Sequence, residues 1–336
     1  MKLFLIRHGE TVDNVAGLYA GVRDSALTIH GVEQARRLGE YLAKTDVKLT
    51  HIFSSPLSRA RKTAEAIQRA QQSTDGKGIR SGKDELEICQ VQDLIEQDFG
   101  YYEGKPFFAR SERNKSGREA HNDKHKDDPG FVDVESKESM CMRADTFLDE
   151  HLVPLLRHGD SGADLKIAVV SHGMLLSNLW RRLLSRLPRK SLAIAPEVTA
   201  ARGSIVLEHL GGWSNTGYLE LDLSQQTSTA ELGAGSIITE DNNAANLIAP
   251  LTPFPLAVPE DELPASAASS APSKKVSDSP THSVARTLQS FTTTILAVDS
   301  KQHLVGLKRQ RGGIGRLAYD ESQKKLDGFF KRQKTS

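Results

Sequence analysis

The sequence contains only two cysteines, Cys89 and Cys141, among 336 residues. Two cysteines give neither a disulfide framework nor the ligand spacing of a zinc site, so we expect a reducing, intracellular environment. Long apolar runs are missing too. The run at 3–6 is too short for the core of a signal peptide, and no stretch approaches the ~20 apolar residues of a membrane span. We therefore expect neither secretion nor a membrane partner.

A strong charge of either sign is also absent, because 44 Lys and Arg face 43 Asp and Glu. The chain as a whole is thus not a polyanion binder, and nucleic acid is not an expected partner.

Apolar residues are scarce: they make up 38% of the chain, and the mean hydropathy is −0.42. This polarity predicts a folded core joined to a poorly ordered portion.

The composition changes after about residue 223. Residues 224–290 are rich in Ser, Ala, Pro and Thr and poor in aromatics, so they can bury too little apolar surface to offset their ordering entropy. We predict a folded domain over 1–223, a disordered linker over 224–290 and a basic C-terminal tail over 291–336. Within that tail, residues 292–298 are strand-like and could pack back on the core.

Within the folded part, apolar periodicity predicts alternating helices and strands. Helices are expected at 28–44, 57–72, 139–157 and 174–187, and strands at 3–6, 51–56, 86–94, 166–171, 204–210 and 216–223. Residues 110–128 are densely charged, which is typical of a mobile surface flap. That flap holds His121 and His125 four residues apart, but no third ligand accompanies them, so no metal site is expected.

Two of the expected buried strands end in a histidine followed by glycine, at His8 and His172. In a parallel sheet both histidines would emerge at the same edge, where α/β folds bind ligands. Arg7 precedes the first histidine, and Glu96 follows the third apolar run. Arg59 lies at the start of a helix, where a cation opposes the helix dipole. That local cost indicates a role in binding a ligand.

Together these residues have the chemistry for phosphoryl transfer. Arginines clamp tetrahedral oxyanions in bidentate fashion. A neutral imidazole can attack phosphorus and form a covalent intermediate, and a carboxyl group can protonate the leaving oxygen. Such a set supplies positioning and charge neutralisation without a metal or another cofactor.

Six short motifs follow one another in the first two thirds of the chain. They are RHGET at 7–11 with Asn14 shortly after, LTIHG at 27–31, SSPLSRA at 54–60, LIE at 94–96 with Gly100 and EG at 103–104, ES at 138–139 with Arg143, and VSHG at 170–173. In this order they resemble the histidine phosphatase superfamily, also called phosphoglycerate mutase-like. The resemblance covers roughly residues 1–223. It implies a three-layer α/β/α sandwich with a mostly parallel central sheet.

The resemblance also implies roles for single residues. His8 would be the phosphorylated nucleophile, and Glu96 would donate a proton and later activate water. Four side chains would contact the phosphoryl oxygens: Arg7, Asn14, Arg59 and His172. We assign His172 to the catalytic group with His8 and Glu96.

Two of these assignments leave alternatives open. Asp93, Asp98 and Glu103 lie near Glu96 in the sequence and are its rivals, although the spacing from Glu96 to Gly100 matches the family. A solvated carboxylate at a turn is the simplest alternative for Glu96. For His172 the alternative is a hydrogen-bonded core histidine.

Three activities are compatible with this resemblance. Mutases of the family carry a basic, proline-rich insertion after the glutamate motif, and residues 110–128 contain no proline run. A phosphomonoester phosphatase with a phosphohistidine is therefore the main prediction. Phosphoglycerate mutase-type transfer and a catalytically weak scaffold remain alternatives. The sequence does not identify the phosphorylated substrate.

The C-terminal tail carries a motif of its own. From residue 301 on it holds ten Lys and Arg against three Asp and Glu. Residues 323–332 read QKKLDGFFKR, which resembles the PIP box, the peptide that docks on the sliding clamp, proliferating cell nuclear antigen. One helical turn would present four contact residues to the clamp: Gln323, Leu326, Phe329 and Phe330. Basic clusters at 308–311 and 331–334 could serve nuclear import, so the expected location is the nucleus, the cytoplasm or both.

Overall fold

The computed structural model describes residues 1–45, 47–73, 86–106, 125–158, 164–226, 287–310 and 313–320. Contacts within the chain group residues 1–226 with 285–336 as one compact unit and 227–284 as a second. The second unit, most of the expected flap and the four contact residues of the PIP-box-like motif lie outside the described residues. The fold below is that of the first unit.

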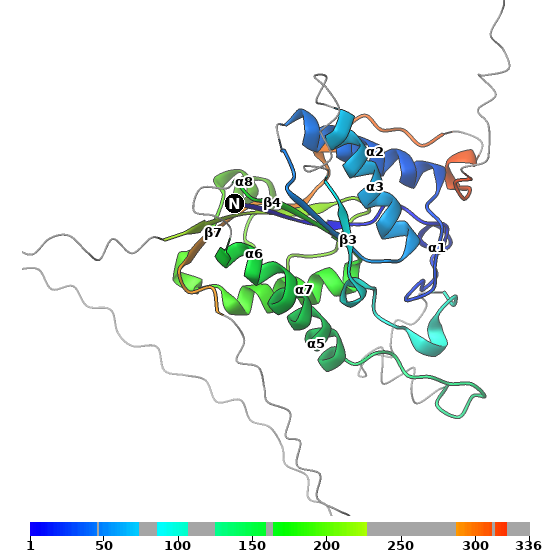
Figure 1. Ribbon diagram of the computed structural model, residues 1–336. Helices are drawn as coiled ribbons and strands as arrows, with labels where there is room; N and C mark the ends of the chain where they lie inside the picture. Colours follow the sequence, from blue (N-terminus) through cyan, green and yellow to red (C-terminus); the bar gives the residue numbers. More distant parts are fainter. Residues whose placement is uncertain are drawn as a thin grey trace, which may run out of the picture. The chain divides into compact units, whose positions relative to one another are not determined.

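A seven-stranded sheet forms the centre of this unit, with strand order β3-β2-β4-β1-β6-β7-β5 (Figure 1). The strands are β1 Lys2–Arg7, β2 His51–Ser54, β3 Ile88–Gln90, β4 Lys166–Ser171, β5 Leu192–Ile194, β6 Tyr218–Gln225 and β7 Phe291–Ser300. Strand β6 runs antiparallel to both of its neighbours, and all other pairs are parallel. The mostly parallel sheet expected from the sequence is thereby confirmed.

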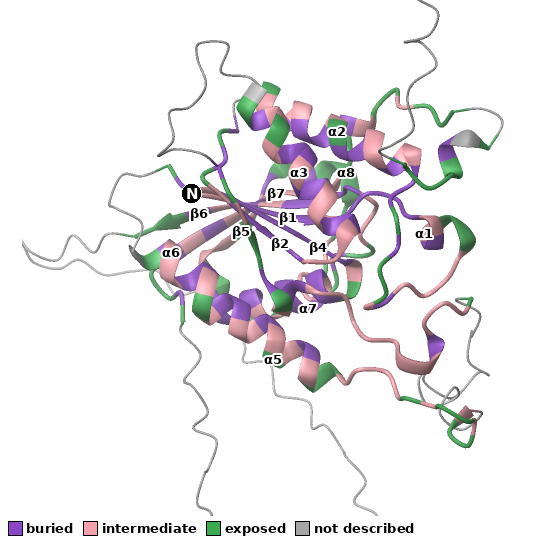
Figure 2. Cartoon of the chain, turned by 45° about the vertical axis from the view of Figure 1, so that its right-hand side comes forward, coloured by how far each residue is buried: buried purple, intermediate pink, exposed green. Residues whose placement is uncertain are grey.

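Helices cover the sheet on both sides. They are α1 Val12–Ala16, α2 Ile29–Lys44, α3 Ser58–Ser73, α5 Lys137–Phe147, α6 Val153–His158, α7 Gly173–Arg186 and α8 Pro196–Arg202. Helices α2 and α3 lie on one face, and α5, α6 and α7 lie on the other (Figures 1 and 2). This is the predicted α/β/α sandwich.

The alternation of side chains along β1 explains the two layers. Successive residues of a strand point to opposite faces. Leu3 and Leu5 accordingly belong to the core with Phe147 and Trp180 of the α5–α7 side. Phe4 and Ile6 belong to the core with Leu38, Ala60 and Ala64 of the α2–α3 side. Because these four residues of β1 are fully buried, the middle of the strand reads as a continuous apolar run.

Several elements begin and end where the sequence predicted. Helix α2 starts after Thr28, whose hydroxyl accepts a hydrogen bond from Gly31 N as an N-cap.

Two other elements differ from the prediction. The helix expected at 139–157 is interrupted by a π-helical turn at Leu148–Leu152. The strand expected at 86–94 is limited to β3 and is followed by a 3₁₀ turn, Gln92–Leu94.

The prediction of a strand at 204–210 is wrong. This segment makes no sheet ladder and is held by side chains instead. Trp180 Nε1 donates to Leu207 O at 2.6 Å, and Arg202 donates to Leu210 O at 3.1 Å. Strand β5 and helix α8 lie just before it and were not anticipated.

Strand β7 lies in the sheet between β6 and β5, so the strand-like segment 292–298 does pack back on the core. Its residues Phe291 and Ile295 are buried in the core beneath α5–α7. The chain then passes along α2, where Ile29 N donates to Leu317 O and Tyr319 N donates to Leu27 O. Residues 287–320 thus complete the same unit as residues 1–226.

Candidate active site

The predicted site residues gather at the carboxyl ends of β1, β4 and β2. The register pairs Arg7 with Ser171 and Ser54 with Val170, so the residues that follow these strands emerge side by side. The imidazoles of His8 and His172 lie 5.1 Å apart between ring centroids. Both are buried, at 3% and 0% exposure.

The geometry of His8 is that of a nitrogen nucleophile. Its Nδ1 lies 2.7 Å from Gly9 O. A carbonyl can only accept, so Nδ1 carries the proton and Nε2 carries the lone pair. Burial lowers the pKa of His8 well below its usual value, and the charges of Arg59 and Arg7 lower it further. The ring is therefore neutral at physiological pH, as attack on phosphorus requires.

Two glycines allow the loop after β1 to pass close to the start of α2. A Cβ atom on Gly9 would lie 2.6 Å from Gly31 O, and one on Gly31 would lie 2.0 Å from Glu10 O. Neither position can hold a side chain without moving the backbone. Gly9 N also donates to Thr63 Oγ1 of α3 at 3.1 Å. The loop that carries His8 is thus fixed by both helices of one layer.

Arg7 presents a buried donor to the pocket. Its Nη1 donates to Trp213 O at 2.6 Å, whereas its Nε is buried and has no hydrogen-bond partner. Burial lowers the pKa of the guanidinium, and the charge of Glu96 partly opposes this effect. A buried donor without a partner is costly. An anionic oxygen of a ligand would satisfy it.

Arg59 and His172 form one hydrogen-bonded group. Arg59, 1% exposed, donates to Arg23 O at 2.8 Å and to Gly21 O at 2.6 Å. Its Nε donates to His172 Nδ1 at 3.2 Å, and His172 Nε2 bonds Ser55 Oγ at 2.8 Å. Both ring nitrogens of His172 thus have protein partners, so in this arrangement His172 orients Arg59.

Burial lowers the pKa of His172 well below its usual value, and Arg59 lowers it further. Its ring is therefore neutral, and with Nδ1 accepting from Arg59 the proton lies on Nε2. Ser55 Oγ then accepts the hydrogen bond that Nε2–H donates. Ser55 belongs to the SSPLSRA motif, but its own part in the site was not foreseen.

Glu96 is held at the N-terminus of α7 by backbone groups. Its Oε1 accepts from Leu175 N at 3.1 Å and Gln97 N at 2.9 Å, and its Oε2 accepts from Met174 N at 3.3 Å. Arg143 fixes the preceding turn by donating to Ile95 O at 3.0 Å. The carboxylate is therefore positioned before any ligand binds.

The three rival carboxylates lie elsewhere. Of the four candidates, Glu96 is the one among the described residues that line the pocket. Asp98 accepts from Gly100 N at 2.6 Å. Glu103 accepts from Val22 N at 2.7 Å, next to the carbonyls that bind Arg59. Burial raises the pKa of Glu103, and those backbone donors partly offset the rise.

Asn14 completes the inner part of the site. Its Oδ1 accepts from Thr11 N at 3.2 Å and from Asn215 Nδ2 at 3.0 Å. Asn215 Nδ2 also donates to His8 O at 3.2 Å, so it links Asn14 to the backbone of the nucleophile. Asn215 was missed because no motif of the chain includes it.

These side chains surround a pocket of about 550 Å³. Five of the six predicted residues line it, and His172 lies behind Arg59. The five are Arg7, His8, Asn14, Arg59 and Glu96. The outer wall is formed by apolar and aromatic side chains: Leu18, Tyr19, Phe99, Met174 and Trp213. The basic and acidic groups thus share the pocket with a set of apolar and aromatic side chains.

Two residues that follow the region 224–290 support the loop of His8 from a distance. Arg309 forms a bidentate ion pair with Glu10, with Nη1 at 2.6 Å from Oε1 and Nη2 on Oε2. Burial opposes ionisation of Glu10, but bonds from Arg309 and Thr28 outweigh it and lower the pKa of the carboxyl. Asp299 accepts from Ser214 N at 2.7 Å, beside the carbonyl that holds Arg7.

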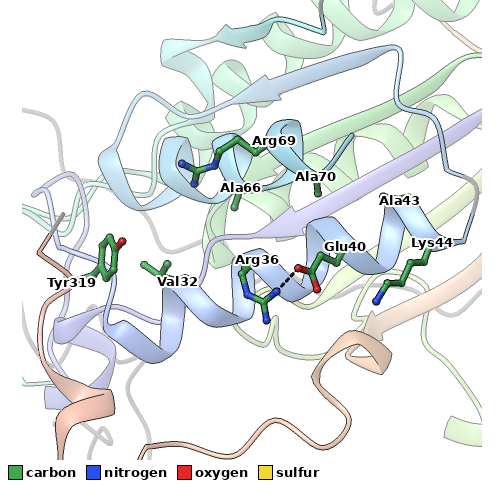
Figure 3. A pocket seen from close by; sticks show the side chains of 9 residues that line it. All are labelled: Val32, Arg36, Glu40, Ala43, Lys44, Ala66, Arg69, Ala70 and Tyr319. Atoms are coloured by element: carbon green, nitrogen blue, oxygen red, sulfur yellow. Dashed lines mark hydrogen bonds and ion pairs between the residues drawn. The ribbon is translucent and has the colours of Figure 1, made fainter. Parts of the chain in front are cut away.

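A second pocket, of about 450 Å³, lies between α2 and α3. Its walls combine short apolar side chains and charged side chains of the two helices, with Tyr319 at one end (Figure 3). Arg36 and Glu40 form an ion pair one turn apart on α2 at this pocket (Figure 3). This pocket contains no predicted site residue.

Within the described ranges, no group of three or more His, Cys, Asp or Glu side chains could hold a metal ion, and no helix is long and apolar enough to cross a bilayer.

Comparison with known proteins agrees with the geometry. The model of the histidine phosphatase superfamily (branch 1) matches residues 3–215. A Schizosaccharomyces pombe protein named "Probable phosphatase" is 31% identical over 245 residues, which cover 71% of this chain and 69% of that protein. "Phosphoglycerate mutase-like protein 4" of Arabidopsis thaliana is 30% identical over 182 residues, 54% of this chain and 70% of that protein. Among solved structures, a mycobacterial glucosyl-3-phosphoglycerate phosphatase in complex with VO3 is 21% identical, with a TM-score of 0.45 over 66% of this chain and 91% of that chain.

Proposed function

Since this chain belongs to the histidine phosphatase superfamily (branch 1), we propose that it is a metal-independent phosphomonoester phosphatase that acts through a phosphohistidine on His8. One observation carries the proposal. His8 keeps its Nδ1 proton on Gly9 O, so a neutral Nε2 is available in a pocket that it shares with Arg7 and Arg59. Nucleophile and oxyanion clamp are therefore assembled in advance.

The first step transfers the phosphoryl group to the enzyme. The lone pair of His8 Nε2 attacks phosphorus, and the bond from phosphorus to the alcohol oxygen breaks. Glu96, protonated at this stage, gives its proton to that oxygen, and the alcohol leaves. Arg7 and Arg59 neutralise charge on the three other oxygens. The bond from Nδ1–H to Gly9 O stabilises the positive charge that the ring acquires.

The second step releases inorganic phosphate. The Glu96 carboxylate takes a proton from water while the water oxygen attacks phosphorus. The bond between phosphorus and Nε2 breaks, and its electron pair returns to His8. Glu96 is again protonated and His8 again neutral, so the cycle consumes one water and needs no metal.

The test is to trap the phosphoenzyme. Full-length protein mixed with a radiolabelled phosphomonoester and quenched in alkali should carry an acid-labile, alkali-stable label, with turnover inhibited by vanadate. His8→Ala should lose both label and turnover. His51→Ala, which changes a histidine on β2 outside the pocket, should keep both. Turnover without a labelled intermediate, or a label that survives in His8→Ala, would exclude this mechanism.

The mutase alternative requires a site for a second anionic group. Among the described residues that line the pocket, the cationic side chains are Arg7 and Arg59, and both are assigned to the transferred phosphoryl group. We therefore propose hydrolysis as the main reaction. With 3-phosphoglycerate and catalytic 2,3-bisphosphoglycerate, we expect inorganic phosphate and no 2-phosphoglycerate. Interconversion of the two phosphoglycerates without phosphate release would overturn this choice. If the wild-type protein catalyses neither reaction, the scaffold alternative is favoured.

We also propose that the C-terminal tail binds the sliding clamp and brings the phosphatase to it in the nucleus. The support is the spacing of Gln323, Leu326, Phe329 and Phe330 and the flanking basic residues, which suit an acidic partner with an apolar pocket. Wild-type protein should be retained on immobilised clamp, and the double variant Phe329→Ala/Phe330→Ala should not. No retention of the wild type, or equal retention of both, would end the proposal.

A further inference from the structure

The in-line geometry of the proposed reaction fixes where the leaving alcohol lies. Phosphorus must sit between His8 Nε2 and the oxygen that leaves. That oxygen must in turn lie within hydrogen-bond reach of Glu96, which protonates it. The carbon skeleton of the alcohol therefore extends into the part of the pocket next to Glu96. The neighbours of Glu96 then determine which alcohols the enzyme accepts.

Those neighbours are aromatic and apolar. Phe99 lies three residues after Glu96 and lines the pocket, and its ring packs on Tyr19 with centroids 4.7 Å apart at 44°. Met174, whose backbone N–H holds Glu96 Oε2, lines the pocket with a side chain that is 46% exposed. Leu18 and Trp213 extend the same wall. A planar apolar group would bury this surface.

The polar groups of this part of the pocket already have partners. Trp213 Nε1 donates to Ser177 Oγ at 3.0 Å, and Ser177 Oγ donates to Gly173 O at 2.9 Å. Among the described lining residues, the charged side chains are Arg7, Arg59 and Glu96, all of which serve the phosphoryl group. A carboxylate or a polyol on the alcohol would lose its hydration without gaining a charged partner there.

We propose that the preferred substrates are phosphomonoesters whose alcohol carries an uncharged aromatic ring, and that this ring packs against Phe99 and Tyr19. The inference rests on the proposed phosphatase activity, since it uses the direction of attack from His8. It assigns the specificity of the enzyme to the wall formed by Leu18, Tyr19, Phe99, Met174 and Trp213, which no motif of the chain includes.

The test compares esters with equally poor leaving groups. 2-Phenylethyl phosphate and ethyl phosphate release alcohols of similar basicity, so a difference in kcat/KM reports on the ring. Wild-type enzyme should favour the phenylethyl ester by about tenfold or more, which is the scale of one buried aromatic contact. It should favour that ester over glycerol 3-phosphate and 3-phosphoglycerate as well. Equal or reversed preference would overturn the inference.

Substitution of the wall locates the effect. Phe99→Ala should reduce the phenylethyl preference about tenfold, through a higher KM for the phenylethyl ester. The matched control is Tyr101→Ala, which removes an aromatic two residues away that bonds Asp128 and does not line the pocket. If Phe99→Ala fails to fold, Phe99→Leu tests the same point. An unchanged preference in a folded Phe99 variant, or an equal loss in Tyr101→Ala, contradicts the assignment.

One further comparison identifies the source of the aromatic ring. An aromatic ring bearing phosphate can belong to a small molecule or to a phosphotyrosine side chain. A phosphotyrosine peptide turned over faster than free phosphotyrosine points to a protein source, and the reverse order points to a small molecule. If wild-type enzyme hydrolyses no ester at all, the proposed function fails. If it hydrolyses esters without regard to the ring, only this inference fails.

Discussion

His8, the proposed nucleophile, is neutral because of where it lies, and this has a consequence for pH dependence. Burial and then the charges of Arg59 and Arg7 hold its pKa well below the usual value of 6.5. The active form is the deprotonated one, so a lowered pKa extends activity toward acid. We expect kcat/KM, corrected for ionisation of the ester itself, to stay level as pH falls through 6.5. A pH–rate profile checks this, and an acid limb at or above 6.5 would contradict it.

The site residues were predictable to different degrees. Arg7 and His8 end a continuous apolar strand, and Arg59 starts a helix against its dipole, so composition and position alone singled them out. The hydrogen bonds of His172 were not predictable, because Ser55 and Arg59 reach it from another strand and helix. Asn215, Asp299 and Arg309 gave no signal, since each acts on a loop far away in the sequence.

The apolar wall is the other part that the sequence did not indicate. Leu18 and Phe99 look like ordinary core residues in a pattern of hydrophobicity. Only the path of the loops places them around the carboxylate of Glu96. Specificity of this kind depends on loop geometry, whereas the short motifs of this chain contain the residues of the proposed reaction centre.

At the scale of elements, the segment after β7 braces the loop that carries His8. Arg309→Ala would leave the carboxylate of Glu10, 11% exposed, with Thr28 as its remaining side-chain donor. We expect a loss of about 1–3 kcal/mol in the free energy of unfolding together with a lower kcat. Urea denaturation and steady-state kinetics measure both.

The controls for that variant come from the same segment. Lys308→Ala removes an exposed neighbouring cation and should be nearly neutral, and Arg309→Lys should recover part of the loss. Because the pKa of Glu10 is lowered in the folded state, the stabilisation is present above its ordinary range and disappears as pH falls through the folded value. Equal stability of wild type and Arg309→Ala at neutral pH would contradict the bracing role.

Short elements were the ones that sequence patterns misjudged. Strand β5, three residues long, exists because it pairs in parallel with Thr293–Ile295 of β7, a partner that no local pattern reveals. Residues 204–210 have the apolar content of a strand, but Trp180 and Arg202 use their carbonyls as acceptors. Tertiary partners outweigh propensity in such segments. The long helices α2, α3 and α7 were predicted because their periodicity is sustained.

For the whole molecule, a buried histidine makes stability depend on pH. Burial lowers the pKa of His303 from 6.5 to about 4, and its Nε2 bonds Thr216 Oγ1 at 2.9 Å. Between these values the unfolded chain binds a proton that the folded chain does not, so stability falls as pH falls below 6.5. From pH 7 to pH 5 we expect this residue to remove about 2 kcal/mol from the free energy of unfolding.

The measurement is urea denaturation of wild type and His303→Gln at both pH values. The glutamine variant should lose less stability on acidification, by the contribution of His303. The buried rings of His8 and His172, whose pKa values are lowered in the same direction, keep the variant acid-sensitive even so. An identical pH dependence of the two proteins would show that His303 does not titrate as described.

The overall architecture was the most predictable feature. The order of six motifs indicated the superfamily and the α/β fold, and both are confirmed. The reason is physical: apolar strands, amphipathic helices and the residues at their junctions are all local features. The position of β7 inside the sheet was not predicted, because residues 226–290 separate β7 from its partner strand β6 in the sequence.

The place of β7 in the sheet affects how the protein is made. During translation β6 leaves the ribosome before the whole of residues 226–290, and β7 follows. Until then β6 has a free edge able to pair with other chains, and Arg7 and Glu10 lack the support of Asp299 and Arg309. Chaperones and proteases therefore meet a nascent chain that already holds His8, Arg59 and Glu96 but whose sheet is still open.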